Sequence, residues 1–169
     1  MHVAPQQVKR AIGFEIKMAW LSISKMYNIV SAKAHEAYRE SAIAQKFGMD
    51  KAGTGITTNV GFVLLHIDVE AGTPSTKIAS LMGMEPGSLT RMVKKMEADG
   101  LIYRKDDPCD KRISLIFPTE KGMQVRAIAR EVVIDFNKEV QSRIPEEKLT
   151  IFFEVIDELN DITQNRIKA

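Results

Sequence analysis

The feature that most limits how this chain can fold is the succession of local signals in residues 75–117. A short helical pattern of apolar residues covers Ser75 to Met82 and stops at Gly83. A second helical pattern starts at Pro86, because proline suits the first turn of a helix, where its missing N–H would be unpaired in any case. Two helices joined by a glycine-containing turn are the elements of a helix-turn-helix.

A hairpin is predicted directly after the second helix, which Gly100 ends. Two apolar or β-branched runs, Leu101 to Lys105 and Ile113 to Phe117, are separated by residues 106–112, whose Asp-Pro pair favours a turn. A helix-turn-helix followed by a hairpin makes a winged helix. We therefore predict a mainly α fold with a small β-hairpin wing.

The second helix is predicted to have an apolar face and a basic face. At about 100° per residue, Leu89, Val93 and Met96 share one side and should face the core. The opposite side carries positive charge with short side chains at its flanks, and this combination suits a groove of DNA. The alternative is a solvated helix surface, which is what charge runs usually form. The residues of this side and its flanks are Gly87, Ser88, Thr90, Arg91, Lys94 and Lys95.

Long amphipathic helices are predicted on both sides of the winged region. Before it, apolar residues recur in steps of three or four over residues 7–44, with a candidate break near Ser31. A glycine-containing loop at residues 48–55 separates this helix from a shorter one, which residues 57–58 cap and Gly72 ends.

After the wing, Thr119 caps a helix with an apolar side from Val125 to Val140, and a last helix has an apolar side from Leu149 to Ile162.

The winged domain has too little core surface to cover the apolar faces of all these helices. A second chain should bury part of them, since at roughly 25 cal/mol per Å² a large helical interface holds an obligate dimer. The alternative is a monomer whose terminal helices fold back on its own winged domain. The predicted parts are an N-terminal dimerisation region (1–52), a winged helix-turn-helix domain (56–122) and C-terminal dimerisation helices (123–169).

The charge balance changes along the chain, although the formal net charge is only +2. Residues 77–126 carry ten Lys and Arg against seven acids, and residues 1–51 carry eight against four. Residues 131–161 carry three against nine. A surface for a polyanion is therefore expected in the N-terminal or middle part of the chain.

Several classes of protein are disfavoured by the sequence. No apolar run approaches the roughly 20 residues that cross a bilayer, and the first residues lack a signal-peptide pattern, so we expect a cytosolic protein with no membrane partner. One cysteine and three scattered histidines offer neither a disulfide nor metal-site spacing. No metal or other cofactor is expected. Catalytic motifs, such as a Gly-rich phosphate loop, are also missing, which makes an enzyme the least favoured function.

Five motifs carry a family resemblance. In chain order they are Ser75-Thr76-Lys77-Ile78-Ala79, Pro86-Gly87-Ser88-Leu89-Thr90-Arg91, Asp99-Gly100-Leu101-Ile102, Asp107-Pro108-Cys109-Asp110-Lys111-Arg112 and Thr119-Glu120-Lys121-Gly122. In order and spacing, residues 73–122 resemble the multiple antibiotic resistance regulator (MarR) family of winged-helix transcription factors. The resemblance implies a sequence-specific regulator of double-stranded DNA, most often a repressor, which binds a pseudo-palindromic operator as a homodimer.

The resemblance also implies which residues meet DNA. In that family the helix matching Glu85 to Asp99 reads the major groove, and the wing-tip arginine, here Arg112, enters the minor groove with its orientation fixed by the acid at Asp110. A narrow minor groove favours an inserted guanidinium. The alternative is a winged helix that binds a protein partner and no DNA. The candidate DNA-binding residues are Ser75, Pro86, Gly87, Ser88, Thr90, Arg91, Lys94, Lys95, Asp110, Lys111 and Arg112.

A small-molecule effector, aromatic or phenolic, is a further implication, because family pockets lie between the dimer helices and the winged domain. Its candidate contacts are Trp20, Tyr27 and His66, for which packing roles are the simpler alternative.

Two features of the wing have two interpretations each. Cys109 lies near two aspartates that disfavour a thiolate, so it is interpreted as an inert thiol rather than a redox sensor. Arg104 and Lys105 either contact DNA phosphates or only solvate their strand.

Overall fold

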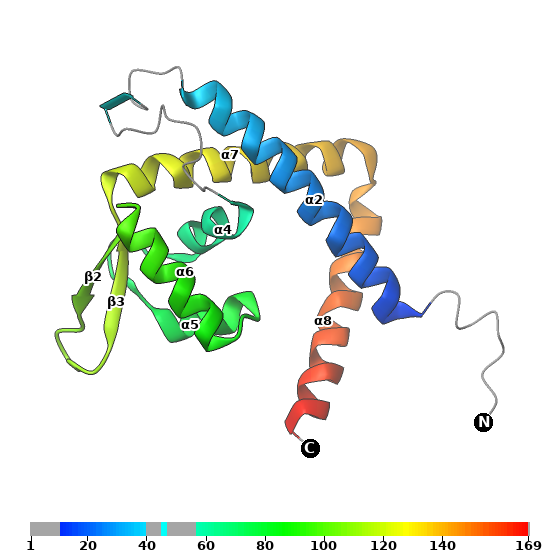
Figure 1. Cartoon of the computed structure of the whole chain (residues 1–169). Helices are drawn as coiled ribbons and strands as arrows, with labels where there is room; N and C mark the ends of the chain where they lie inside the picture. The colour runs from blue at the N-terminus through cyan, green and yellow to red at the C-terminus, as the bar shows by residue number, and fades with distance from the viewer. Residues whose placement is uncertain (1–10, 40–44, 47–56, 169) are drawn as a thin grey trace. The chain divides into compact units, whose positions relative to one another are not determined.

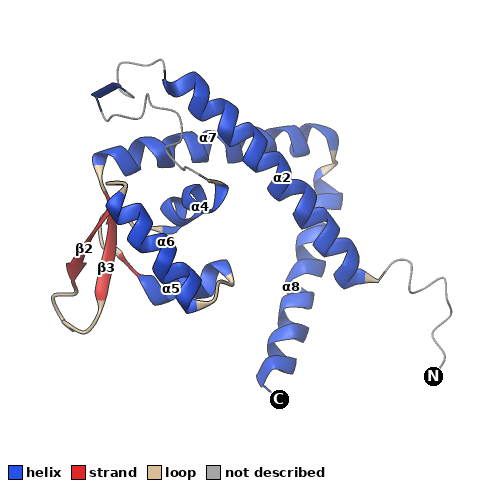
Figure 2. Cartoon of the chain, viewed as in Figure 1, coloured by secondary structure: helices blue, strands red, loops and turns tan. Residues whose placement is uncertain are grey.

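The computed structural model describes residues 11–39, 45–46 and 57–168 (Figure 1). The chain divides into two compact units, residues 1–132 and 133–169, and one helix runs from the first into the second. Helices dominate, with one small sheet (Figure 2). The described elements are α2 (Ile12–Arg39), α4 (Thr58–His66), β1 (Thr73–Pro74), α5 (Ser75–Met82), α6 (Pro86–Ala98), β2 (Ile102–Asp106), β3 (Ser114–Pro118), α7 (Glu120–Arg143) and α8 (Glu146–Lys168).

The core of the first unit lies among α4, α5, α6, the sheet and the start of α7. The apolar side predicted for α6 is buried there, and so is Ile78 of α5. Leu81 of the same helix is apolar but 55% exposed. Ala79 and Met82 pack against the core instead, and they centre the buried side of α5 away from Leu81. The core members are Val60, Val63, Leu64, Ile67, Ile78, Leu89, Val93, Met96, Leu101, Ile102, Ile116 and Val125.

The turn between α5 and α6 is built on Gly83, which has a φ of 57° in the left-handed region. The Gly83 N–H donates to the Ser80 carbonyl (3.3 Å), and the Met84 N–H donates to the Ala79 carbonyl (3.1 Å). These bonds satisfy carbonyl groups that the end of α5 would otherwise leave unpaired. The predicted bounds of α5 and the predicted start of α6 at Pro86 are confirmed.

The sheet has three antiparallel strands in the order β1-β3-β2. The predicted hairpin is formed by β2 and β3, with Tyr103 opposite Phe117 and Lys105 opposite Leu115. The sequence did not predict β1, which pairs Thr73 with Ile116 on the other edge of β3. Helix-turn-helix, hairpin and this extra strand together confirm the predicted winged-helix fold.

α4 ends at His66, whereas the sequence predicted a helix that continues until Gly72 stops it. Arg126 of α7 explains the earlier end, because its Nη1 donates to the carbonyls of Leu64 and Ile67, the latter at 3.3 Å. A guanidinium at this position pairs the last carbonyls of α4 and interacts favourably with the helix dipole. The end of α4 is therefore set by a residue about 60 positions later in the chain.

A tight turn at Asp68 carries the chain from α4 to β1. The N–H groups of Ala71 and Glu70 each donate to the Asp68 carboxylate at 2.9 Å, and these bonds hold the pKa of that carboxyl below its ordinary value. The Asp68 N–H donates to the Thr73 hydroxyl (2.9 Å). Gly72, which the sequence predicted as the helix stop, lies in this turn with a φ of 73°.

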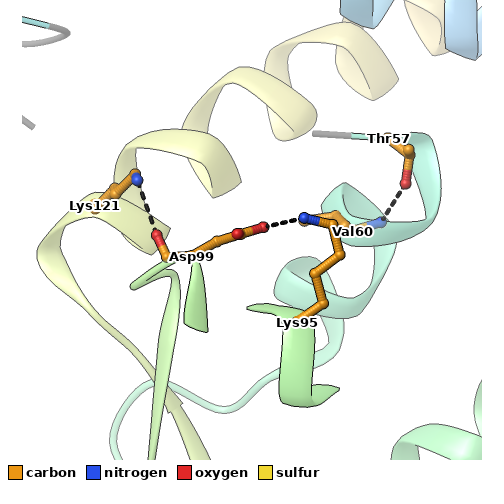
Figure 3. A network of polar contacts seen from close by, with 5 residues as sticks. All are labelled: Thr57, Val60, Lys95, Asp99 and Lys121. Atoms are coloured by element: carbon orange, nitrogen blue, oxygen red, sulfur yellow. Dashed lines mark hydrogen bonds and ion pairs between the residues drawn. The ribbon is translucent and has the colours of Figure 1, made fainter. Parts of the chain in front are cut away.

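Polar contacts hold the end of α6 and the start of α4 (Figure 3). Lys121 of α7 donates to the Asp99 carbonyl (2.8 Å), and Lys95 forms an ion pair with the Asp99 carboxylate (2.9 Å). A lysine ammonium at the carboxyl end of a helix pairs a carbonyl that lacks an intrahelical donor. At the start of α4, the Thr57 side chain accepts the Val60 N–H (3.4 Å), which confirms the predicted cap.

The start of α7 packs closely on the start of β2. The Thr119 hydroxyl accepts the Gly122 N–H (3.0 Å), which confirms Thr119 as the cap of this helix. The Thr119 N–H donates to the Leu101 carbonyl (3.0 Å), and the Thr119 hydroxyl donates to the Gly100 carbonyl (2.6 Å). A Cβ on Gly122 would lie 1.9 Å from the Leu101 carbonyl oxygen, so only glycine fits at this position.

α2 is one continuous helix through Ser31, so the candidate break there is wrong. Within the first unit it packs on α4 through the Tyr27 ring, which meets Phe62 edge to face with centroids 5.6 Å apart. Tyr38 also donates to the Gln124 side chain of α7 (3.3 Å). The rest of the predicted helix, residues 7–10 and 40–44, and the predicted loop at 48–55 lie outside the described residues.

The second unit contains the end of α7 and α8. On the apolar side predicted for α8, Leu149, Ile156 and Leu159 are partly buried in the single chain and Phe152 is exposed. Ile151, Val155 and Ile162, on a neighbouring side of the helix, are exposed as well. Among the described helices, none combines the length and apolar character needed to cross a bilayer.

Candidate nucleic-acid interface

α6 presents a basic face opposite its buried side. Leu89, Val93 and Met96 are buried, while Arg91, Lys94 and Lys95 are exposed. This confirms the predicted division of the helix into two faces. Glu85 precedes the helix without a side-chain capping bond.

The predicted residues of this face differ in how strongly they are held. Arg91 lies one turn from Ser88, and its Nη2 donates to the Ser88 hydroxyl at 3.4 Å. Lys95 is paired with Asp99, as Figure 3 shows, so part of its charge is neutralised within the helix. Gly87 and Lys94 are exposed.

α5 and α6 together form a small hollow of about 160 Å³. It brings Ser75 of α5 close to Thr90 of α6, two predicted DNA contacts from different helices. Hydroxyl groups at its wall and the apolar Ala79 and Leu89 suit contact with a nucleotide.

The wing tip is a turn organised by two aspartates. The Asp107 carboxylate accepts the N–H groups of Cys109 (2.7 Å) and Asp110 (3.2 Å), and the Asp110 carboxylate accepts the Arg112 N–H (2.9 Å). The expected link between Asp110 and Arg112 is thus made to the backbone, and among the described residues no ion pair joins their side chains. Asp110 therefore fixes the turn from which the exposed Lys111 and Arg112 project.

Arg104 and Lys105 have partners within the protein. The Arg104 Nε lies 3.1 Å from the carboxylate of Glu97 on α6. The Lys105 Nζ lies 5.4 and 5.5 Å from the ring centroids of Tyr103 and Phe117, which stack on each other. Sequence reasoning missed Glu97, because no periodic pattern relates the end of a helix to the middle of the next strand.

The three candidate effector contacts lie on two helices, Trp20 and Tyr27 on α2 and His66 at the end of α4. Trp20 is 55% exposed on α2, whereas Tyr27 is buried against Phe62, and burial raises the pKa of its hydroxyl. His66 is exposed, with its Nδ1 2.7 Å from the Phe62 carbonyl oxygen. A second hollow, of about 440 Å³, lies wholly within the second unit and is lined by Gln141, Ile144, Glu146, Leu149, Thr150 and Phe153.

In the described ranges, no three His, Cys, Asp or Glu side chains gather as metal ligands. Cys109 is a free, exposed thiol on the wing.

Comparison with known proteins finds a family model that matches the winged region of this chain. Residues 56–114 match the model of the MarR family. A curated relative, the uncharacterized HTH-type transcriptional regulator YybA of Bacillus subtilis (strain 168), is 33% identical over 67 residues, which cover 40% of this chain and 45% of YybA. The chain thus spans about half the length of that relative.

Solved structures of the transcriptional repressor CouR are similar over nearly the whole chain. CouR bound to a 23-mer DNA duplex aligns with a TM-score of 0.65 at 18% identity and covers 95% of this chain and 99% of CouR. CouR from Rhodococcus jostii RHA1 bound to p-coumaroyl-CoA aligns with a TM-score of 0.61 at 25% identity, and the alignment covers 90% of this chain and 94% of that CouR chain.

Proposed function

Because this chain carries a winged-helix domain of the MarR family, we propose that the protein is a sequence-specific DNA-binding transcriptional regulator, acting as a repressor. It binds a pseudo-palindromic operator as a homodimer, and a small aromatic or phenolic molecule modulates its binding. The proposal draws support from YybA, an HTH-type transcriptional regulator, and from CouR, a repressor solved with DNA.

The observation that carries the proposal is the basic face of α6 beside a wing tipped with Arg112. The opposite face of α6 is anchored in the core, so Arg91 and Lys94 are held outward on a rigid helix. Such a helix fits the major groove, and a wing arginine fits the minor groove. The chain supplies both from one domain.

Exposed apolar helices support the homodimer. α2 leaves Ile12, Phe14, Ile16 and Trp20 exposed, and α8 leaves a similar face uncovered. α2 carries four basic against two acidic residues, while α8 carries six acidic against three basic, so contacts between unlike helices of two chains would bring opposite charges together. A twofold axis would then place two copies of α6 about 34 Å apart, one turn of DNA.

The effector is proposed from CouR, which was solved with p-coumaroyl-CoA, a ligand with a phenolic group. In this chain Tyr27 and Trp20 lie on α2, which also carries the proposed dimer surface. A ligand bound there would alter DNA binding only if its affinity differs between the DNA-competent spacing of the two chains and other spacings.

A salt-dependent gel shift with the DNA upstream of the protein's own gene tests DNA binding. We expect a sequence-selective complex that weakens steeply with salt. Arg91→Ala should cost about 1 to 3 kcal/mol of binding free energy if Arg91 reads a base, and Arg112→Ala should remove minor-groove selectivity. Binding of all variants with equal affinity, or no selective complex, would contradict the proposal.

Trp20 offers a test of the dimer, because it is the only tryptophan in the chain. On dilution through the dimer dissociation constant, its fluorescence emission should move to longer wavelength as the indole becomes exposed to water. Sedimentation at the same concentrations should show the change in mass. A monomer at all concentrations would contradict the operator model.

A further inference from the structure

The ion pair between Glu97 and Arg104 joins the helix that carries the basic face to the wing. Glu97 lies in the last turn of α6, and Arg104 is the middle residue of β2. The Arg104 Nε and a Glu97 carboxylate oxygen are 3.1 Å apart, and the two side chains are 33% and 43% exposed. The contact bridges the tight turn at Gly100, where the helix ends and the strand begins.

β2 is fixed at its start, where Ile102 lies in the core, and along one edge. It is the outer strand of the described sheet and pairs with β3. Beyond its first residue, every residue of β2 is exposed. The stacked rings of Tyr103 and Phe117, with Lys105 over them, belong to the hairpin itself. The Glu97–Arg104 pair can therefore set the angle between the hairpin and α6.

That angle matters if both elements read the same DNA. The basic face of α6 and Arg112 at the wing tip must reach two grooves at once, and β2 leads directly into that tip. A hydrogen bond to DNA is lost when donor and acceptor separate by about 1 Å beyond their normal distance. A small rotation of the hairpin would be enough to withdraw Arg112.

We propose that Glu97 and Arg104 are positioning residues, whose ion pair holds the wing at the angle from which Arg112 reaches the minor groove. Neither residue needs to touch DNA. This inference deepens the proposed function and rests on it, since the wing must bind DNA for its angle to matter.

The positioning role and a direct phosphate contact by Arg104 predict opposite signs for Glu97. If Arg104 bound a phosphate, removing the Glu97 charge would release Arg104 and make the surface more positive, so DNA affinity would rise. If the pair positions the wing, losing either partner frees the hairpin, and affinity falls in both cases. The expected loss is about two- to fivefold, the range for ion pairs of this exposure.

The test is a double-mutant cycle on the full-length chain. Glu97→Gln, Arg104→Gln and the double variant are measured by fluorescence anisotropy against a duplex that the wild-type protein selects from a random DNA library. Each single change should weaken binding about two- to fivefold, and the double variant should be no weaker than either. The charge-swapped variant, Glu97→Arg with Arg104→Glu, should recover part of the loss.

Two further measurements separate positioning from a folding defect. Melting temperatures of the variants should match the wild type, while hydroxyl-radical footprints should lose the protection that the wing gives and keep that of α6. Glu120→Gln is the matched control, since it removes one acid from an exposed ion pair with Lys46 (3.0 Å) at the start of α7. It should leave affinity and footprint unchanged.

Tighter or unchanged binding by Glu97→Gln, or additive effects of the two single changes, would overturn the positioning role. Such results would still leave a DNA-binding protein. If the wild type selects no duplex from the library, the proposed function fails and the positioning role fails with it.

Discussion

Replacing Gly122 by alanine should strongly destabilise the winged domain. The new Cβ would lie 1.9 Å from the Leu101 carbonyl oxygen, whereas real Cβ atoms essentially never come within 3.0 Å of a neighbour, so the two must separate by about 1 Å. Leu101 cannot yield easily. Its side chain is buried, its N–H donates to Met96 (2.9 Å), and its carbonyl accepts from Thr119 (3.0 Å).

The magnitude follows from three contributions. Overpacking in a rigid site costs about 1 to 3 kcal/mol of stability. Losing the hydrogen bond between Thr119 and Leu101 leaves the Leu101 carbonyl unpaired, which costs about another 1 to 3 kcal/mol. Alanine gains about 1 kcal/mol of helix propensity over glycine. Because the clash is with anchored backbone, we expect the upper range, a net loss of about 3 to 5 kcal/mol and a fall in melting temperature of roughly 10 °C or more.

Thermal unfolding at fixed protein concentration measures this loss, with Gly87→Ala as the matched control. Gly87 also lies in a helix, but a Cβ there would meet nothing within 4 Å. That variant should be unchanged or up to about 1 kcal/mol more stable. If Gly122→Ala melts within a few degrees of the wild type, the close packing of α7 on β2 does not limit this position, and the reasoning is wrong.

Three further changes test contacts elsewhere in the first unit. Arg126→Met should lower the free energy of unfolding, measured by urea denaturation, by about 1.5 to 3 kcal/mol, because the last carbonyls of α4 lose a charged donor. The control Arg130→Met, on the exposed side of α7, should stay within about 0.5 kcal/mol of the wild type. The pKa of Asp68 is lowered in the folded state, so its carboxylate should stabilise the fold fully above pH 3.8. This stabilisation should disappear as the pH falls through the lower pKa of the folded state. Asp68→Asn should remove this contribution to the acid dependence of stability. The pKa of Tyr27 is raised above 10.0, so its contribution should be present below pH 10 and lost as pH rises further, and Tyr27→Phe should flatten an alkaline denaturation curve.

The sequence predicted the parts of this fold that depend on local signals. α5 and the start of α6 were placed correctly because Gly83 and Pro86 each fix the backbone within one turn. The buried side of α6 followed from helical periodicity alone. The hairpin strands were placed within one residue of their observed bounds, since β-branched runs flank an Asp-Pro turn.

The parts that depend on distant residues were not predicted. β1 has two residues, too few for an alternating pattern, and it exists because the edge of β3 accepts a partner. The early end of α4 depends on Arg126, and the link between α6 and the wing depends on Arg104. In each case the deciding contact joins residues from different elements, which no local pattern records.

These long-range contacts change how many positive charges remain for DNA, and the salt dependence of binding can measure that number. Residues 77–126 contain ten Lys and Arg, but five of them have partners within the protein: Lys95, Arg104, Lys105, Lys121 and Arg126. If the other five are the ones that meet DNA, each chain supplies Lys77, Arg91, Lys94, Lys111 and Arg112. For a dimer, log affinity against log salt should have a slope of about −9, and doubling the salt should weaken binding about 500-fold. If all ten bound phosphates the slope would approach about −18, so a measured value near that limit would mean that DNA displaces the internal partners.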